Sequence, residues 1–285
     1  MAAKTKSQNE SVEIAILPIT QGTMSFAVLG TSPLIFNRMA EKAKRELLLP
    51  KGKKNIAERA GSLKHDPMAE YQASVYRSQE ADSPTRLCIP APAFKGAMMT
   101  AALDLPGTKR TEIGRLTWVT GYSVSLWGVP ELLMSVVRSA DMNKTPDVRT
   151  RAIVRNWACI VDVNFVRPKL NATEVGHLMA AAGILSGIGD FRQEKGKGNF
   201  GQFQLVEAND PRFLAIQKAG GRAAQDAALA NPRCFDDESA ELMQFFGAEV
   251  VRQGKGAMRA GAEPVDDMPV AAKTKDARSN GARAH

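Results

Sequence analysis

Hydrophobic and polar residues alternate between residues 23 and 29, where Met24, Phe26 and Val28 occupy every second position. Successive side chains of a strand point to opposite faces, so this period predicts a half-buried β-strand. The strand is expected to end at the turn-forming residues 30–33. Runs rich in β-branched and aromatic residues predict further strands at 118–119, 122–127, 132–137, 157–166 and 202–206.

Helical spacing of apolar residues is clearest between Asn171 and Leu185. A second helix is expected at 94–103, after the Pro-rich start at residue 90 and before Pro106. A basic helix is expected from Asn37, its N-cap, to about residue 49. Between these elements the pattern predicts short strands within 66–89, a basic loop at 141–151, and two short helical stretches after 208.

The order of the main elements is that of a βαββαβ unit. We therefore expect an α+β, ferredoxin-like (RRM-like) core with an inserted basic helix and a flexible C-terminal tail. The core domain is placed at 12–207, with a basic insertion at 37–89. The remaining divisions are a disordered N-terminus at 1–11, a short helical extension at 208–252 and a disordered, Ala/Gly/Lys/Asp-rich tail at 253–285.

The net charge of +8 is confined to the first part of the chain. Residues 1–206 hold 27 Lys or Arg against 18 Asp or Glu, whereas residues 207–285 hold 11 against 12. Clusters of this kind are typical of proteins that bind polyanions, because each neutralised phosphate releases condensed counterions. A solvated surface is the alternative interpretation. The clusters lie at 38–64, at Arg149, Arg151 and Arg155, and at Arg192, Lys195 and Lys197.

Composition narrows the class of protein further. A hydrophobic fraction of 44% with 24% charged residues is ordinary for a globular chain. The three cysteines are far apart and form no C-x-x-C pair, which argues against a zinc site or a disulfide scaffold. No apolar run approaches the length of a membrane span, and the first residues lack the apolar segment of a secretory signal. We expect a cytoplasmic protein, bacterial or from a phage-infected host, with no membrane partner.

A glycine-rich loop separates the helix after Asn171 from the last predicted strand. It matches neither a Walker loop nor a dinucleotide fingerprint, because it follows a helix and precedes a strand. Closely spaced glycines let a backbone approach a partner and adopt positive φ. The basic side chains of the same loop suit a sugar–phosphate backbone. The glycines are Gly187, Gly189, Gly196, Gly198 and Gly201.

This loop resembles that of the RAMP superfamily, the ferredoxin-like RNA-binding proteins that include the backbone subunits of CRISPR effector complexes. The resemblance rests on Gly-Ile-Gly at 187–189 and Gly-Lys-Gly-Asn-Phe-Gly at 196–201, and on the Pro-x-x-x-x-Lys-Gly turn at 90–96. The chain is also similar to a group of phage proteins with Gly-Thr-Ser-Pro-Leu at 30–34. The resemblance covers roughly 21–207. It implies an RNA-binding fold whose copies line up along a strand.

We therefore predict a non-catalytic, largely sequence-independent protein that binds RNA or another single-stranded nucleic acid, as a homo-oligomer along the strand. We expect no cofactor, no metal and no catalytic residue. The predicted nucleic-acid-binding residues are Arg38, Lys42, Lys44, Arg45, Arg149, Arg151, Arg155, Gly187, Gly189, Arg192, Lys195, Lys197 and Gly198.

Three alternatives stay open. A phage recombination protein that binds or anneals single-stranded DNA has the same charge pattern and a different ligand. A metal-independent ribonuclease would use His65 as general base with Asp66 as its partner. A structural or assembly protein would not meet nucleic acid at all. Phe200 and Phe203 resemble the stacking residues of RNA-recognition sheets, but an extra residue in their spacing favours a core role.

Overall fold

The computed structural model describes residues 18–39, 48, 65–138, 146–195 and 198–252. The predicted basic helix and both predicted disordered termini fall largely or wholly outside these residues. The chain divides into two compact units, with the boundary after Met243. Of the second unit, the structure describes residues 244–252, which form the end of a helix. The elements below belong to the first unit unless stated otherwise.

An antiparallel sheet forms the centre of the fold. In the described part of the chain it has seven strands, in the order β10-β1-β9-β6-β4-β3, with β5 also paired to β9. The longest register joins β1 to β9, from Thr20 opposite Arg167 to Leu29 opposite Ala158. The strands are β1 (Thr20–Gly30), β3 (Tyr76–Arg77), β4 (Leu87–Pro90), β5 (Thr117–Val119), β6 (Ser123–Trp127), β9 (Ala158–Arg167) and β10 (Phe203–Val206).

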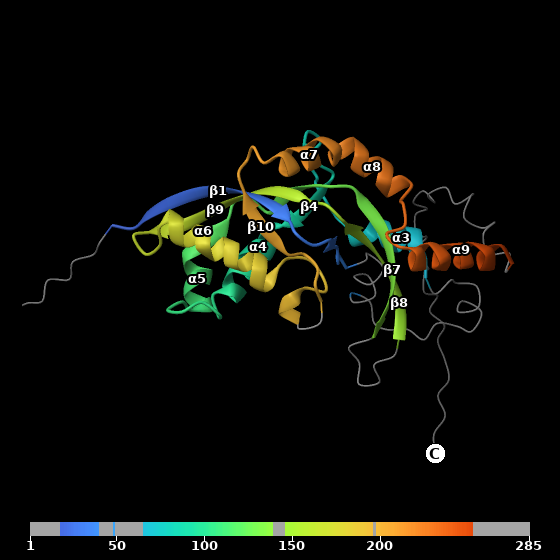
Figure 1. Cartoon of the computed structure of the whole chain (residues 1–285), viewed down its shortest axis with the longest axis horizontal. Helices are drawn as coiled ribbons and strands as arrows, with labels where there is room; N and C mark the ends of the chain where they lie inside the picture. The colour runs from blue at the N-terminus through green and yellow to red at the C-terminus, as the bar shows by residue number, and fades with distance from the viewer. Residues whose placement is uncertain (1–17, 40–47, 49–64, 139–145, 196–197, 253–285) are drawn as a thin grey trace, which may run out of the picture. The chain divides into compact units, whose positions relative to one another are not determined.

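Helices cover both faces of this sheet. Figure 1 shows one group of helices below the sheet and another above it. The alternation in β1 matches this layering, because Phe26 and Val28 are buried with the lower helices, while Leu29 packs on Phe213 of the upper side. The lower helices are α4 (Ala91–Ala101), α5 (Arg110–Leu116) and α6 (Ala172–Ala181); the upper ones are α7 (Pro211–Ala219) and α8 (Arg222–Ala230).

The main core lies between the sheet and α4 and α6. Phe203 of β10 contacts the rings of Phe94 and Trp157 edge to face, with centroids 6.0 Å and 6.2 Å apart. Helix α6 starts at a capping box, in which Asn171 and Glu174 each accept a hydrogen bond from the other's backbone N–H. The predicted strand and helix positions in this region are confirmed to within a few residues.

One buried amide fixes α8 to the sheet. The Nε2 atom of Gln225 lies within 3.0 Å of the carbonyl oxygens of Leu126, Gly128 and Gly220. Its Oε1 atom accepts hydrogen bonds from the backbone N–H groups of Arg86 and Leu87 at 2.7 Å and 2.9 Å. A fully buried polar side chain is tolerated here because all of its hydrogen-bonding capacity is used.

A second sheet has three strands within the described ranges, in the order β2-β8-β7, and helix α3 packs on it. Residues 146–151, predicted as a basic loop, belong to strand β8. The sequence prediction fails because charged residues interrupt the strand pattern, while pairing with β7 supplies the backbone hydrogen bonds. The elements are β2 (Leu34–Ile35), α3 (Pro67–Ser74), β7 (Pro130–Arg138) and β8 (Pro146–Val154), followed much later by α9 (Asp237–Arg252).

Candidate nucleic-acid interface

The glycine-rich loop folds tightly onto its own chain. Gly187, Gly189 and Gly201 have φ of 70°, 85° and 74°, in the region that favours glycine. A Cβ atom on Gly189 would lie 2.5 Å from Leu34 Cδ1, and one on Gly201 would lie 1.7 Å from the oxygen of Ile188. The close approach expected at a sugar–phosphate backbone is therefore made here to the protein's own β2 and loop residues.

Backbone hydrogen bonds hold this loop against β2. Asp190 donates from its N–H to the oxygen of Ile35 at 2.9 Å, and Gly201 donates to that of Pro33 at 2.8 Å. Gly198 is buried, and a Cβ on it would lie 1.5 Å from the oxygen of Phe191. The glycines thus position the loop's side chains instead of offering an open backbone surface.

Arg151 of β8 joins the loop to the second sheet. Its guanidinium forms an ion pair with Asp190, and the residue is 8% exposed. Burial lowers the pKa of the Arg151 guanidinium, an effect that the Asp190 carboxylate opposes. The Nε atom of Arg151 is buried without a hydrogen-bond partner in the described part of the chain. Arg151 therefore acts mainly as a structural link, and its contact with a ligand is limited to the exposed edge.

Arg149 is exposed and lies on the same strand face, two residues before Arg151. It has no ion-pair partner within the described ranges. Together with Arg38 and His65 it lines a pocket of about 490 Å³. Arg38 is held at this pocket by α3, because its backbone N–H donates to the oxygen of Ser74 at 2.9 Å. The fold thus places cations from residues 38 and 149 around one hollow.

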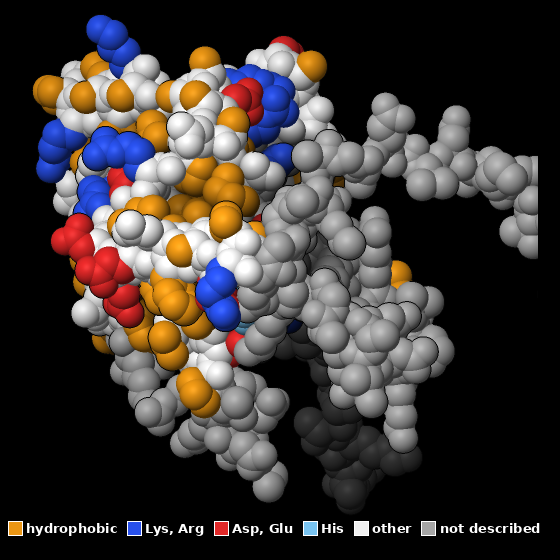
Figure 2. Space-filling model, turned by 90° about the vertical axis from the view of Figure 1, so that its right-hand side faces the viewer, with side chains coloured by type: hydrophobic (Ala, Val, Ile, Leu, Met, Phe, Trp, Pro, Cys, Tyr) orange, Lys and Arg blue, Asp and Glu red, His pale blue; other side chains and the backbone are white. Residues whose placement is uncertain are grey.

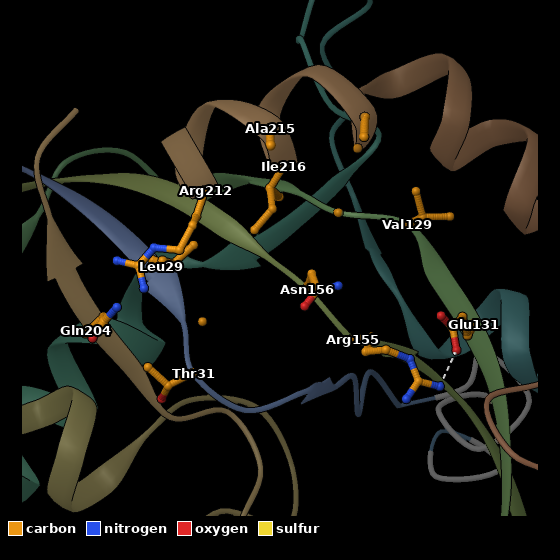
Figure 3. Close-up of a pocket in the computed structure, with 14 residues that line it drawn as sticks. Leu29, Thr31, Val129, Glu131, Arg155, Asn156, Gln204, Arg212, Ala215 and Ile216 are labelled. Atoms are coloured by element: carbon orange, nitrogen blue, oxygen red, sulfur yellow. Dashed lines mark hydrogen bonds and ion pairs between the residues drawn. The ribbon is translucent and has the colours of Figure 1, made fainter. Parts of the chain in front are cut away.

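Arg155 lies apart from this pocket. It pairs with Glu131 at 3.0 Å, donates to the Phe235 oxygen at 2.7 Å, and stacks over the Phe235 ring at 4.1 Å. Its guanidinium lines a different hollow of about 680 Å³, bounded on the opposite side by Arg212 of α7 (Figure 3). The sequence cluster of Arg149, Arg151 and Arg155 is therefore divided between two pockets, because the chain turns from β8 to β9 at this point.

The remaining predicted basic residues are placed only in part. Arg192 is half-buried and pairs with Glu194 at 3.1 Å, so its charge is largely offset within the loop. The backbone of Lys195 closes a 3₁₀ turn that starts at Gln193. The Lys195 side chain and Lys42, Lys44, Arg45 and Lys197 lie outside the described part of the chain.

Phe191 is a loop residue that the sequence prediction missed. Its side chain is 48% exposed, and its ring centroid lies 6.0 Å from that of Phe200. The available signal was an aromatic residue between Asp190 and Arg192 in a mostly polar segment, with no apolar residue two positions to either side. Phe203, by contrast, is 1% exposed, which confirms the predicted core role for that position.

His65 does not pair with Asp66 as the ribonuclease alternative expects. Asp66 caps α3 by accepting a hydrogen bond from Ala69 N–H at 3.3 Å. The ring of His65 contacts Glu70 through Nδ1 at 2.9 Å and Asp147 through Nε2 at 3.2 Å. Both ring nitrogens therefore face carboxylate oxygens, and neither is free to take a proton from a ribose hydroxyl.

Surface features outside the loop are mixed. Figure 2 shows Lys and Arg side chains interspersed with Asp and Glu between hydrophobic ones, on the side that lies at the right of Figure 1. The described residues contain no group of three or more His, Cys, Asp or Glu that could hold a metal ion. Within the same ranges, no helix combines the length and apolar character needed to cross a bilayer.

No protein-family model and no curated protein sequence match the chain. Among solved structures, it is similar to the crystal structure of Cmr6 from Pyrococcus furiosus, with 8% identity and a TM-score of 0.34 over 66% of this chain and 98% of that chain. It is also similar to a chain of the Type III-B Cmr-beta complex bound to cognate target RNA. That match has 11% identity and a TM-score of 0.31, and covers 64% of this chain and 59% of that chain.

Proposed function

We propose that the chain binds RNA or another single-stranded nucleic acid, without cleaving it, on a ferredoxin-like fold of the RAMP type. The strand order supports the fold assignment. β10, β1, β9 and β6 are adjacent, with α4 between β1 and β6 in sequence and α6 between β9 and β10. A ferredoxin-like βαββαβ unit has this arrangement. The remaining strands are then insertions: β2, β3 and β4 come before α4, β5 lies between α4 and β6, and β7 and β8 lie between β6 and β9.

The observation that carries the function is the convergence of Arg38, Arg149 and Arg151 at one pocket, beside the glycine-rich loop. Arg38 and Arg149 are far apart in sequence, so their meeting is a property of the fold. The exposed guanidinium of Arg149 suits phosphate oxygens, which accept bidentate hydrogen bonds from Arg. Arg38 is half-buried and Arg151 is buried beside it. Glu70 and Asp147 lie at the same pocket, paired with His65, and leave Arg149 available.

The test is the salt dependence of binding to a labelled single-stranded RNA, measured by fluorescence anisotropy with the full chain. Arg149→Ala is expected to reduce the slope of log K against log salt by about 0.7, because one phosphate contact is lost. Arg115→Ala is the matched control, because Arg115 is exposed on α5 and its substitution removes the same charge outside the pocket.

Equal slopes for Arg149→Ala and Arg115→Ala would remove the pocket from the interface. No binding by the unmodified chain would reject the function itself. Competition between RNA and DNA of the same sequence then identifies the ligand, because only RNA carries the 2′-hydroxyl.

A further inference from the structure

Phe191 combines two unfavourable features at one position. Its φ is 52°, and it is the one non-glycine residue with a positive φ in the described ranges. Residues other than glycine, asparagine and aspartate rarely adopt this conformation, and bulky ones least of all. Its aromatic ring is also nearly half exposed to solvent. Asparagine or glycine at this position would avoid both costs, so folding alone does not explain the phenylalanine.

The neighbouring residues impose this conformation. On one side, Asp190 is fixed by its ion pair with Arg151 and by its hydrogen bond to Ile35. On the other, the oxygen of Phe191 accepts a hydrogen bond from Phe200 N–H at 3.4 Å and packs against Gly198. The backbone is therefore held from both sides while the ring is left at the surface.

Phe200 supports the exposed ring from below. It is partly buried and packs against the small apolar cluster of Ile35, Leu133 and Ile153. The two rings are tilted by 40°, with centroids 6.0 Å apart. Phe191 is thus the outer member of an aromatic pair whose inner ring is anchored in the apolar cluster.

The described neighbours of this pair are charged and polar. Arg192 follows Phe191 directly and pairs with Glu194, while Asp190 precedes it and pairs with Arg151. Aromatic faces flanked by basic side chains are how proteins hold unpaired bases, since the ring stacks on the base while the cations contact the backbone. An apolar protein partner would be matched poorly by these charges.

We propose that Phe191, supported by Phe200, stacks on an unpaired base of the bound strand. This inference rests on the proposed function, and it names the chemical group that this part of the interface recognises. Stacking on a π-face accepts any base, so the site adds affinity for single strands without selecting a sequence.

The experiment compares two labelled strands of equal length, an RNA oligonucleotide and one whose central nucleotides are abasic. Phe191→Asn is the main variant, because asparagine adopts positive φ more readily and should fold at least as stably. It is expected to lose about 5- to 100-fold affinity for the base-bearing strand and none for the abasic one. Tyr122→Asn removes an aromatic ring that is 97% exposed elsewhere, and should change neither.

The outcomes separate the inference from the proposed function. If the unmodified chain binds neither strand, both are wrong. If it binds both strands equally, or if Phe191→Asn binds the base-bearing strand as the unmodified chain does, nucleic-acid binding stands and the stacking site is wrong. Photocrosslinking of a 5-iodouridine-labelled RNA to the unmodified chain provides a second measurement. Crosslinks are expected on Phe191 or Phe200, and crosslinks confined to other peptides would overturn the proposal.

Discussion

At the scale of single residues, the glycine-rich loop illustrates how one motif has two interpretations. Gly189 and Gly201 are needed because the chain contacts itself there, at β2 and at Ile188. The same glycines are what a phosphate-binding loop would require, and the sequence does not say which backbone comes close. Phe191 and Asp190 could not be assigned from sequence either, because their partners Phe200 and Arg151 depend on the folded loop.

Gly201→Ala should lower stability. A Cβ there would lie 1.7 Å from the oxygen of Ile188 at a φ of 74°, so the loop must shift. We expect a loss of about 1–3 kcal/mol in the free energy of unfolding, measured by urea denaturation.

Gly96→Ala is the matched control for that substitution, because nothing lies within 4 Å of a Cβ on Gly96 in helix α4. It should raise stability by about 0.5–1 kcal/mol, since alanine favours the helix. Equal effects of the two substitutions would contradict the tight loop described above.

At the scale of secondary-structure elements, much of the main sheet and helices α4 and α6 could be predicted, whereas helix α5 was not expected. Period-2 alternation identified β1, and the Asn171 capping signal identified α6. Helix α3 was predicted as strand, because it is short and weakly amphipathic and its Asp66-Pro67 start was overlooked. Strand β8 was missed because charged residues interrupt its pattern, and the ion pair that accommodates Arg151 is made with Asp190, far away in the sequence.

The link between β8 and the glycine-rich loop is testable through the Arg151–Asp190 pair. Asp190→Asn leaves a buried guanidinium without its counter-charge and should cost about 3 kcal/mol of the free energy of unfolding. Arg151→Met in addition should recover part of that loss, because the unpaired charge is removed. The measurement is a double-mutant cycle by urea denaturation, with an expected coupling of about 0.5–3 kcal/mol. Additive losses would show that the two elements are not joined by this pair.

At the scale of the whole molecule, the charge asymmetry leads to a prediction about assembly. The excess positive charge resides in residues 1–206, and the sequence predicts a homo-oligomer along one strand. On RNA of increasing length, the number of bound chains should therefore rise in steps, and binding should tighten with length. Mass photometry on strands of graded length measures this directly. A constant ratio of one chain per strand would limit the proposal to a single-copy binder.

The antiparallel pairing of β1 with β9 and β10 has a consequence for synthesis in the cell. Strand β1 ends at Gly30, yet its two neighbours are complete only at Arg167 and Val206. At a translation rate of about 5–20 residues per second, β1 waits roughly 10–35 seconds for the second of them. Until β9 has been synthesised, Phe26, Val28 and Leu29 have no neighbouring strand to pair with, and such non-local pairing makes folding slow. The nascent chain is therefore a natural client for ribosome-associated chaperones, which cover apolar strands until their partners emerge.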